Sequence, residues 1–367
     1  MAQNITAATL LKSQARIAEA YSGDTPSKYP FNEPAMSAAA LLINNQSFQQ
    51  SAFTEDGKYR GREINWIQAG SSTITNNTTP SGATQTCDLS NTVGATSAAK
   101  LYNNNMLISA EIEVTDDVYS NVFSVEELID NRLMKAMKDI RAALNTKMIN
   151  FLDTNKTPIN NDGNLPDAIT FNGTTDIFEV DTTAIDLQSP RGLTDMDALA
   201  MNNDLASWMY LTGRYNFYNS IVDAQYDRLN DDMRHVARFF DPAYNIYTDP
   251  RSLDATLTGK NTFIVGEGTY AVWDYVHPGK TNVPTEVSAD KFEYTINDPV
   301  LVINDNGVLR PLRYNVYYTR ECTSVNKTVG NRTFLHKWEI SLLGGVHEAP
   351  ASEDTHTGIL RIQGVGV

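Results

Sequence analysis

Cysteine is scarce in this chain of 367 residues, and its scarcity narrows the classes of protein to which the chain can belong. The only two cysteines, Cys87 and Cys322, lie far apart in the sequence and match no metal-ligand spacing. We therefore expect no disulfide framework, no structural zinc site and a reducing compartment.

Long apolar runs are missing as well. No stretch reaches the ~18–20 consecutive apolar residues of a transmembrane helix. The first residues, Met1 to Asn4, do not begin a basic segment followed by an apolar run, so we expect no signal peptide. Basic residues are outnumbered, with 29 Lys and Arg against 44 Asp and Glu and a net charge of −15. This balance argues against a surface that grips nucleic acid over its whole extent.

Motifs of catalysis and cofactor binding are also missing. The sequence has no G-x-S-x-G elbow and no Walker loop, and none of its five histidines forms an H-E-x-x-H pair. Residues 266–271 fit the dinucleotide fingerprint G-x-G-x-x-A, but β-like sequence follows where a helix is required, so we interpret them as a turn between strands. Residues 160–163 resemble part of a calcium loop without its closing glutamate. His336 alternates with Trp338 in a strand-like run, which favours packing over metal ligation. We therefore predict no metal, no cofactor and no enzymatic activity.

One long helix is predicted over residues 124–153. Ser124 and Glu127 have the spacing of a capping box at its start. Apolar residues then recur every three or four positions, at Leu133, Met137, Ile140, Leu144, Met148 and Phe151. About thirty residues at ~1.5 Å each make a rod roughly 45 Å long. We expect its basic residues (Lys135, Lys138, Arg141 and Lys147) on the solvated face, with contact to nucleic acid as an open alternative.

Two segments have too little apolar sequence for a core of their own. Residues 1–50 carry a short helical pattern at 9–20 and another piece at 37–43, and otherwise resemble an arm that needs a neighbour's surface. Residues 69–99 are polar and lie between strand-like runs at 61–68 and 101–114, which indicates a protruding β-hairpin. A loop of this length without structure is uncommon inside a compact domain. We predict that Arg60, Arg62, Ile64 and Trp66, near the start of this arm, contact another subunit.

The remaining sequence indicates an α+β fold. Short β-like runs occur at 207–211, 244–247, 262–265 and 270–273, helical patterns at 194–201 and 215–230, and longer strands at 308–318 and 334–342. Asn306-Gly307 is a strong signal for a hairpin that joins a strand ending near 303 to the strand at 308. One more β-like run lies at 358–367.

In this order of parts the chain resembles the major capsid proteins of tailed bacteriophages, which share the Hong Kong phage-type capsid fold. The resemblance rests on the arm, the polar hairpin, the long helix, the strand-then-helix step at 208–230, the short strands at 244–266 and the late strand at 334–350. It implies an N-terminal arm (1–50), an extended loop (51–110), a peripheral domain (111–189) with spine helix 124–153, and an axial domain (190–305). Returning strands (306–350) and a C-terminal strand (351–367) complete it.

The resemblance also implies a function. A structural subunit of this family forms hexamers and pentamers of an icosahedral shell around double-stranded DNA, with scaffolding, portal and decoration proteins as partners. It implies assembly in the host bacterial cytoplasm, a place in the virion, non-specific contact with DNA at most, and no membrane. An encapsulin-like nanocompartment shell of the same fold is the main alternative. A secreted adhesion protein is a third hypothesis, which the missing signal peptide disfavours. An enzyme is a fourth hypothesis, which the lack of a catalytic motif disfavours.

Overall fold

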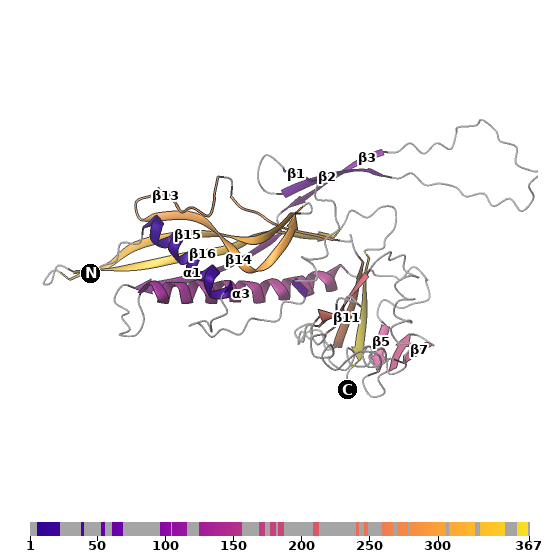
Figure 1. Ribbon diagram of the computed structural model, residues 1–367. Coiled ribbons are helices and arrows are strands. Elements are labelled where there is room, and N and C mark those ends of the chain that lie inside the picture. Colours follow the sequence, from indigo (N-terminus) through magenta and orange to yellow (C-terminus); the bar gives the residue numbers. More distant parts are fainter. Residues whose placement is uncertain are drawn as a thin grey trace, which may run out of the picture.

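The described part of the chain has a mixed α+β fold, in which helices accompany three separate β-sheets. Figure 1 shows it as a computed structural model, with one long helix beneath a large sheet, a second sheet below, and a narrow ribbon projecting to one side. The structure describes residues 6–22, 38–39, 53–55, 61–68, 96–103, 105–115, 125–155, 169–172, 177–180, 183–186, 208–212, 240–241, 246–248, 259–266, 270–277, 279–305, 308–326, 331–348 and 358–365. The helices predicted at 194–201 and 215–230, the loop at 160–163 and Cys87 lie outside these residues.

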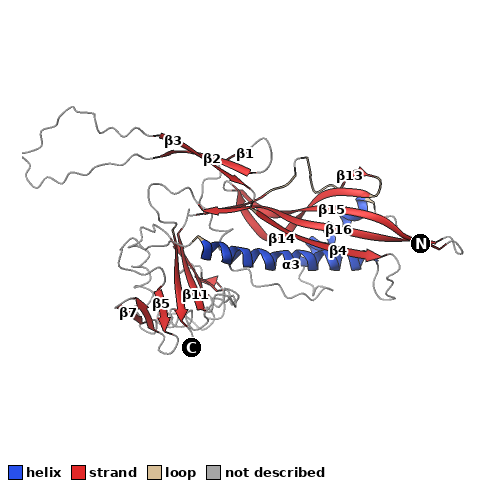
Figure 2. Ribbon diagram, turned by 180° about the vertical axis from the view of Figure 1, so that it is seen from behind, coloured by secondary structure: helices blue, strands red, loops and turns tan. Residues whose placement is uncertain are grey.

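The predicted long helix is confirmed as α3 (Val125–Thr154). Its predicted stripe is buried at all six positions, from Leu133 to Phe151. The stripe packs against one face of a six-stranded antiparallel sheet, which Figure 2 shows from the opposite side. Helix and sheet together form the main core of the part of the chain that the structure describes.

The six-stranded sheet is built mostly from the last third of the chain. Its order is β12-β16-β15-β14-β13, with β4 paired to β16. The strands are β4 (Met106–Thr115), β12 (Tyr270–Asp274), β13 (Thr285–Ser288), β14 (Lys291–Asp305), β15 (Val308–Asn326) and β16 (Asn331–Glu348). The predicted hairpin between β14 and β15 is confirmed by the pairing of Asp305 with Val308, while its turn residues, Asn306 and Gly307, lie outside the described residues.

Alternation along these strands separates an inner face from an outer face. On β4, Ile108, Ala110 and Ile112 pack against the core, while Glu111 and Glu113 are exposed. On β16, Trp338 and Ile340 are buried and Glu339 is exposed. The predicted period-two pattern is therefore confirmed, and the face turned away from α3 is called the outer face below.

The prediction that Arg141 lies on the solvated face of the long helix was wrong. Its side chain is fully buried and pairs with the equally buried Asp298 of β14, at 3.2 Å between Nη1 and Oδ2. Arg141 follows Met137 by four residues and precedes Leu144 by three, so its spacing places it within the buried stripe in spite of its charge. The charge is tolerated because a carboxylate meets it there.

Asp298 connects several elements at the centre of the core. Its Oδ1 accepts hydrogen bonds from the backbone amides of Val300 (2.7 Å) and Leu301 (2.8 Å), where the register of β14 against β15 shifts. Its Oδ2 accepts from the hydroxyl of Tyr314 and from Arg141. Burial and the neighbouring Asp298 carboxylate raise the pKa of Tyr314, so the phenol stays a neutral donor.

The N-terminal segment is less dependent on a neighbour than its sequence indicates. The predicted helix is present as α1 (Ala7–Ser22), and it packs against α3 and β14 of its own chain. Leu10 and Ile17 are buried in the shared core. Asp130 of α3 accepts hydrogen bonds from Ser13 and from Arg16, whose Nε lies 2.5 Å from Oδ2. This part of the predicted arm, residues 7–22, is therefore packed on its own subunit.

Asp130 is expected to hold α1 in place. Asp130→Ala removes the acceptor for Ser13 and Arg16 and leaves Ser13 buried, a change worth about 1.5–3 kcal/mol. Amide exchange across α1 should accelerate by roughly ten- to a hundredfold. Hydrogen-exchange mass spectrometry measures this directly. Asp139→Ala, which removes an exposed pair with Lys135 on the same helix, should leave α1 exchange unchanged; equal acceleration in both variants would contradict the assignment.

A second, eight-stranded sheet collects strands from distant parts of the sequence. Its order is β7-β6-β5-β17-β11-β8-β10-β9. The strands are β5 (Ile169–Asn172), β6 (Ile177–Val180), β7 (Thr183–Asp186), β8 (Trp208–Thr212), β9 (Phe240–Asp241), β10 (Ile246–Thr248), β11 (Gly259–Gly266) and β17 (Ile359–Val365). The pairs β10–β8 and β17–β5 are parallel, and the others are antiparallel.

The two larger sheets collect strands from several of the segments predicted from sequence. Strands β12 to β14, within the segment predicted as 190–305, belong to the same sheet as β15 and β16. Strands β5 to β7, within predicted segment 111–189, and β17, within 351–367, belong to the eight-stranded sheet. Strand β4 begins inside predicted segment 51–110 but pairs with β16. Long-range pairing decides these memberships, and local sequence patterns carry no information about it.

Candidate assembly surfaces

The third sheet is a narrow ribbon of β1 (Phe53–Glu55), β2 (Gly61–Gln68) and β3 (Thr96–Asn103). Both pairs in it are antiparallel, and its ladder runs from Gly61 opposite Asn103 to Gln68 opposite Thr96. Figures 1 and 2 show the ribbon pointing away from the helix and the two larger sheets. Among the described strands, none from either larger sheet pairs with it.

The predicted contact residues fall on or beside β2 of the ribbon. Arg62, Ile64 and Trp66 occupy alternate positions, so the strand places them on one face. Ile64 is opposite Phe53 on one side and Lys100 on the other, and Trp66 is opposite Ala98. The structure thus brings three of the four residues together; Arg60 lies outside the described residues. Their role in contact between subunits stays a prediction.

A second candidate surface is the outer face of the six-stranded sheet. One row of residues crosses four strands in register, from Glu293 (β14) to Tyr317 (β15), Glu339 (β16) and Glu111 (β4). Three of the four carry a negative charge, and Glu339 lies directly opposite Glu111. Like charges at opposed positions of a sheet destabilise it. A row of this kind is a natural place for a cationic group from outside the chain.

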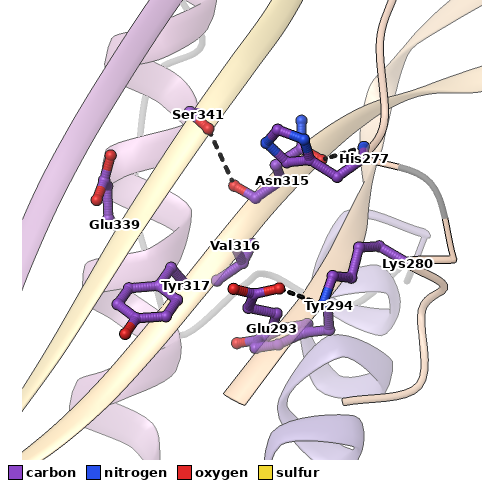
Figure 3. A pocket seen from close by; sticks show the side chains of 9 residues that line it. All are labelled: His277, Lys280, Glu293, Tyr294, Asn315, Val316, Tyr317, Glu339 and Ser341. Carbon is purple, nitrogen blue, oxygen red and sulfur yellow. Dashed lines mark hydrogen bonds and ion pairs between the residues drawn. The ribbon is translucent and has the colours of Figure 1, made fainter. Parts of the chain in front are cut away.

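A pocket of about 220 Å³ opens on this row (Figure 3). Glu293, Tyr317, Glu339, Asn315 and Ser341 come from the sheet. His277 and Lys280, from the segment after β12, supply a second wall, and Tyr294 and Val316 of the sheet complete the lining. Lys280 forms an ion pair with Glu293. No sequence motif marks this pocket, because its residues meet only through the strand register.

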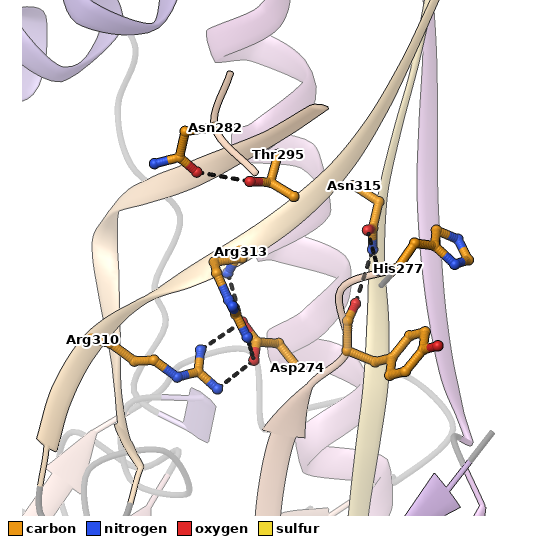
Figure 4. Close-up of polar contacts among 8 residues, drawn as sticks. Asp274, His277, Asn282, Thr295, Arg310, Arg313 and Asn315 are labelled. Carbon is orange, nitrogen blue, oxygen red and sulfur yellow. Dashed lines mark hydrogen bonds and ion pairs between the residues drawn. The ribbon is translucent and has the colours of Figure 1, made fainter. Parts of the chain in front are cut away.

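The pocket wall is held to the sheet by a set of polar contacts, shown in Figure 4. Asn315 accepts a hydrogen bond from the His277 amide at 3.2 Å and donates to the Tyr275 carbonyl at 2.9 Å. Thr295 donates through its hydroxyl to the Asn282 side chain at 2.7 Å. Gly279 adopts a φ of 76° in the turn between them, a conformation that glycine adopts without strain. The wall is therefore preformed on the subunit.

A charged cluster anchors the end of β12 beside this wall (Figure 4). Arg310 donates two hydrogen bonds to the buried Asp274 carboxylate, at 2.6 and 2.8 Å, and the Arg313 amide donates a third at 2.9 Å. Burial by itself would raise the pKa of Asp274. Hydrogen bonds and positive charge from Arg310 and Arg313 outweigh burial, so the pKa of the carboxyl is lowered.

This cluster predicts a pH dependence of stability. Asp274→Asn should lower the free energy of unfolding by about 2–3 kcal/mol at pH 7, since charge-assisted hydrogen bonds are lost. A carboxylate with a lowered folded-state pKa stabilises above its unfolded-state pKa of ~3.9 and loses that effect as pH falls through the folded-state value. The gap between wild type and variant should therefore narrow below about pH 4. Urea unfolding at several pH values measures it.

The matched control is Asp290→Asn, at an exposed aspartate that pairs with Arg320. This control substitution should change the free energy of unfolding by less than ~1 kcal/mol at every pH value measured. A pH-independent loss for Asp274→Asn, or the same loss for both variants, would show that the ionised Asp274 does not stabilise the fold.

Two further sequence interpretations are settled by the geometry. His336 is fully buried, with Nδ1 at 2.7 Å from the Tyr318 hydroxyl and its ring against Trp338, so its predicted packing role is confirmed. After Gly266 the chain resumes as strand β12 at Tyr270, which confirms strand sequence where the dinucleotide fingerprint requires a helix.

Within the described residues, no group of three or more His, Cys, Asp and Glu side chains is arranged to hold a metal ion. No helix among them is both long and apolar enough to cross a membrane. What the described surface offers is a projecting ribbon and a charged sheet face with a pocket, both suited to contact with another macromolecule.

Comparison with known proteins gives matches to solved structures. No family model matches the chain, and no curated protein matches it. The capsid of cyanophage Pam1 is similar over 93% of this chain and 95% of its own, with 11% identity and a TM-score of 0.47. The mature capsid of bacteriophage PhiM1 is similar over 94% and 91%, with 10% identity and a TM-score of 0.42. The chain is similar to phage capsid proteins.

Proposed function

We propose that this protein is the major capsid subunit of a tailed bacteriophage, which assembles into an icosahedral shell around double-stranded DNA. The observation that carries the proposal is the ribbon, a three-stranded sheet that projects from the body and pairs with neither larger sheet among the described residues. The role is structural, not enzymatic, and its place is the virion.

The energetics of the ribbon require a partner surface. Ordering a residue's backbone costs roughly 1–2 kcal/mol, which burial of side chains must offset. A sheet with few strands and no second layer is marginal in water. Ile64 and Trp66 lie on a strand of such a sheet, so a neighbouring subunit is the expected source of burial. In a closed shell, symmetry then repeats the same contact at every subunit.

The two larger sheets and the helices packed on them are suited to form the wall of such a shell. We propose that α3 is the spine helix of a peripheral domain, together with α1 and the six-stranded sheet. The eight-stranded sheet is the proposed axial domain, and β1 to β3 form the base of the proposed extended loop. The buried ion pair between Arg141 and Asp298 joins α3 to the six-stranded sheet, which supports the proposal that helix and sheet form one rigid unit.

The net charge of −15 suits a shell around DNA, since an acidic subunit is repelled by the phosphate backbone. Contact with packaged DNA is then non-specific at most. The proposed partners are other copies of the chain, as hexamers and pentamers, with scaffolding, portal and decoration proteins. Assembly takes place in the host bacterial cytoplasm under this proposal.

Sedimentation velocity and negative-stain microscopy of the purified protein test the proposal. Rings or closed shells of uniform size are expected at micromolar concentration, with or without a scaffold. Particles that contain DNA after phage infection, and not packaged protein, would separate the capsid from a nanocompartment. A chain that stays monomeric at every concentration, even when co-expressed with scaffolding and portal proteins of the same phage, would contradict the proposed function.

A further inference from the structure

We propose that Asn105 is the residue that positions the ribbon on the subunit, and that the direction it sets is needed for subunits to assemble. Asn105 lies between β3 of the ribbon and β4 of the six-stranded sheet. Its side chain occupies the end of the ladder between β4 and β16, where the chain passes from one sheet to the other. The assembly part of this inference rests on the proposed function, and the positioning part concerns the free subunit alone.

The side chain of Asn105 pairs with β16 as a backbone residue would. Strand β4 is in register with β16 as far as Met106 opposite Gly344. Backbone groups along an antiparallel strand point to the same edge at every second residue, so Val346 is the next residue to turn its N–H and C=O toward the β4 edge. Asn105 Nδ2 donates to the Val346 carbonyl at 2.7 Å, and the Val346 amide donates to Asn105 Oδ1 at 3.0 Å. One side chain therefore makes both hydrogen bonds of a paired strand position.

These two hydrogen bonds are made to a buried residue, which narrows the choice of side chain. Val346 is 2% exposed, and buried backbone N–H and C=O groups need partners. A single side chain satisfies both groups only if it carries a donor and an acceptor on one planar end, as asparagine does. Aspartate offers no donor at neutral pH, and alanine offers neither group.

A second contact ties Asn105 to the long helix. Lys147 of α3 donates from Nζ to the Asn105 carbonyl oxygen at 2.9 Å. Asn105 is thus held to the sheet through its side chain and to the helix through its backbone. Strand β16 is itself fixed at this point, because β12 packs closely against it: a Cβ at Gly345 would come within 2.4 Å of the Trp273 ring. The anchor therefore joins Asn105 to the rigid core of the subunit.

The ribbon begins next to this anchor (Figures 1 and 2). Strand β3 ends at Asn103, two residues before Asn105, and Asn103 lies opposite Gly61, the first residue of β2. Among the described strands, none of the larger sheets pairs with the ribbon, so the fixed end of β3 is what sets its direction. An arm that is held in one direction loses less entropy when it binds than an arm that samples many. A fixed base therefore favours assembly.

The distance between two spin labels tests the position of the ribbon in the full-length subunit, below the concentration at which it assembles. After Cys87→Ser and Cys322→Ser, labels are attached through Ser97→Cys on β3 and Asn150→Cys on the exposed side of α3. Double electron–electron resonance should give one narrow distance distribution for this labelled protein, because the base of the ribbon is fixed.

Asn105→Ala should broaden this distribution by about twofold or more, since the freed junction can then sample more than one φ/ψ region. Asn105→Asp keeps the size and the acceptor but loses the donor; it should also broaden the distribution, and it serves if circular dichroism shows that the alanine variant is unfolded. Asn297→Ala is the matched control, at an exposed asparagine of β14, and should leave the width unchanged.

The same Asn105→Ala substitution, in the unlabelled protein, should raise the concentration needed for assembly. If about a tenth of the ribbons keep the competent direction, that concentration rises by about tenfold. Light scattering with sedimentation velocity measures assembly, and Asn297→Ala should assemble like wild type.

An unchanged width in both Asn105 variants, or equal broadening in Asn297→Ala, would overturn the inference. A broad distribution in the labelled protein without further changes would overturn it too, because the ribbon would then have no set direction. A broadened Asn105→Ala variant that assembles like wild type would overturn the assembly part. If the wild-type protein forms no assembly, it is the proposed function that fails, and the distance measurement still decides whether Asn105 positions the ribbon.

Discussion

Replacing Asp298 with alanine is expected to destabilise the subunit by about 3–5 kcal/mol, because it leaves the charge of Arg141 buried and unpaired. The change also removes the acceptor for the amides of Val300 and Leu301 and for the Tyr314 hydroxyl. A loss of this size is a large share of the 5–15 kcal/mol that stabilises a typical protein, on the order of a third or more. Urea unfolding of the free subunit, followed by far-UV circular dichroism, gives the value.

Asp139→Ala is the control for this experiment. Asp139 is an exposed aspartate that pairs with Lys135 on the same helix, and its loss should cost less than ~1 kcal/mol. Equal losses for the two variants would mean that Arg141 reaches solvent and that the helix is seated differently on its sheet. Replacing Arg141 and Asp298 together with apolar residues should recover much of the stability, since no buried charge remains.

The second large effect is expected on assembly and not on folding. Ile64→Ser with Trp66→Ser should block shell formation and leave the unfolding of the free subunit almost unchanged. Burying an Ile or Trp side chain is worth about 1.5–3 kcal/mol or more, so losing both weakens each contact by roughly a hundredfold to ten-thousandfold. Symmetry repeats that loss at every subunit of a shell. Sedimentation velocity measures assembly, and thermal unfolding measures the subunit.

Alternate positions of the same strand supply the control. Glu63→Ser with Asn65→Ser changes the opposite face of β2 and should allow assembly. If the Ile64 and Trp66 variant unfolds instead, these side chains belong to the core of their own subunit. If it assembles normally, the ribbon makes no essential contact.

Periodic patterns predict the elements of this fold but not all of their surroundings. The stripe from Leu133 to Phe151 predicts α3 and its buried face, and the alternation from Ile108 to Val114 predicts β4. Arg141 lies within the stripe by spacing, yet its charge argues for the solvated face. Only the presence of Asp298, 157 residues further on, makes its burial acceptable.

Features that depend on long-range register could not be predicted in the same way. Asp130 joins α1 to α3 across 114 residues, and nothing near Arg16 in the sequence signals that contact. The row of Glu293, Tyr317, Glu339 and Glu111 exists only because four strands align. A shift of one residue in any pairing would turn these side chains to the other face. For the same reason the order of strands in each sheet is not visible in local sequence.

Single-particle cryo-electron microscopy of assembled particles tests the proposed role of the chain as a shell subunit. This role predicts closed icosahedral shells in which the β1–β3 ribbon of each subunit lies on a neighbouring subunit, with α3 and the six-stranded sheet forming the shell wall. A monomeric or open assembly, or a shell in which each ribbon folds back onto its own subunit, would contradict it.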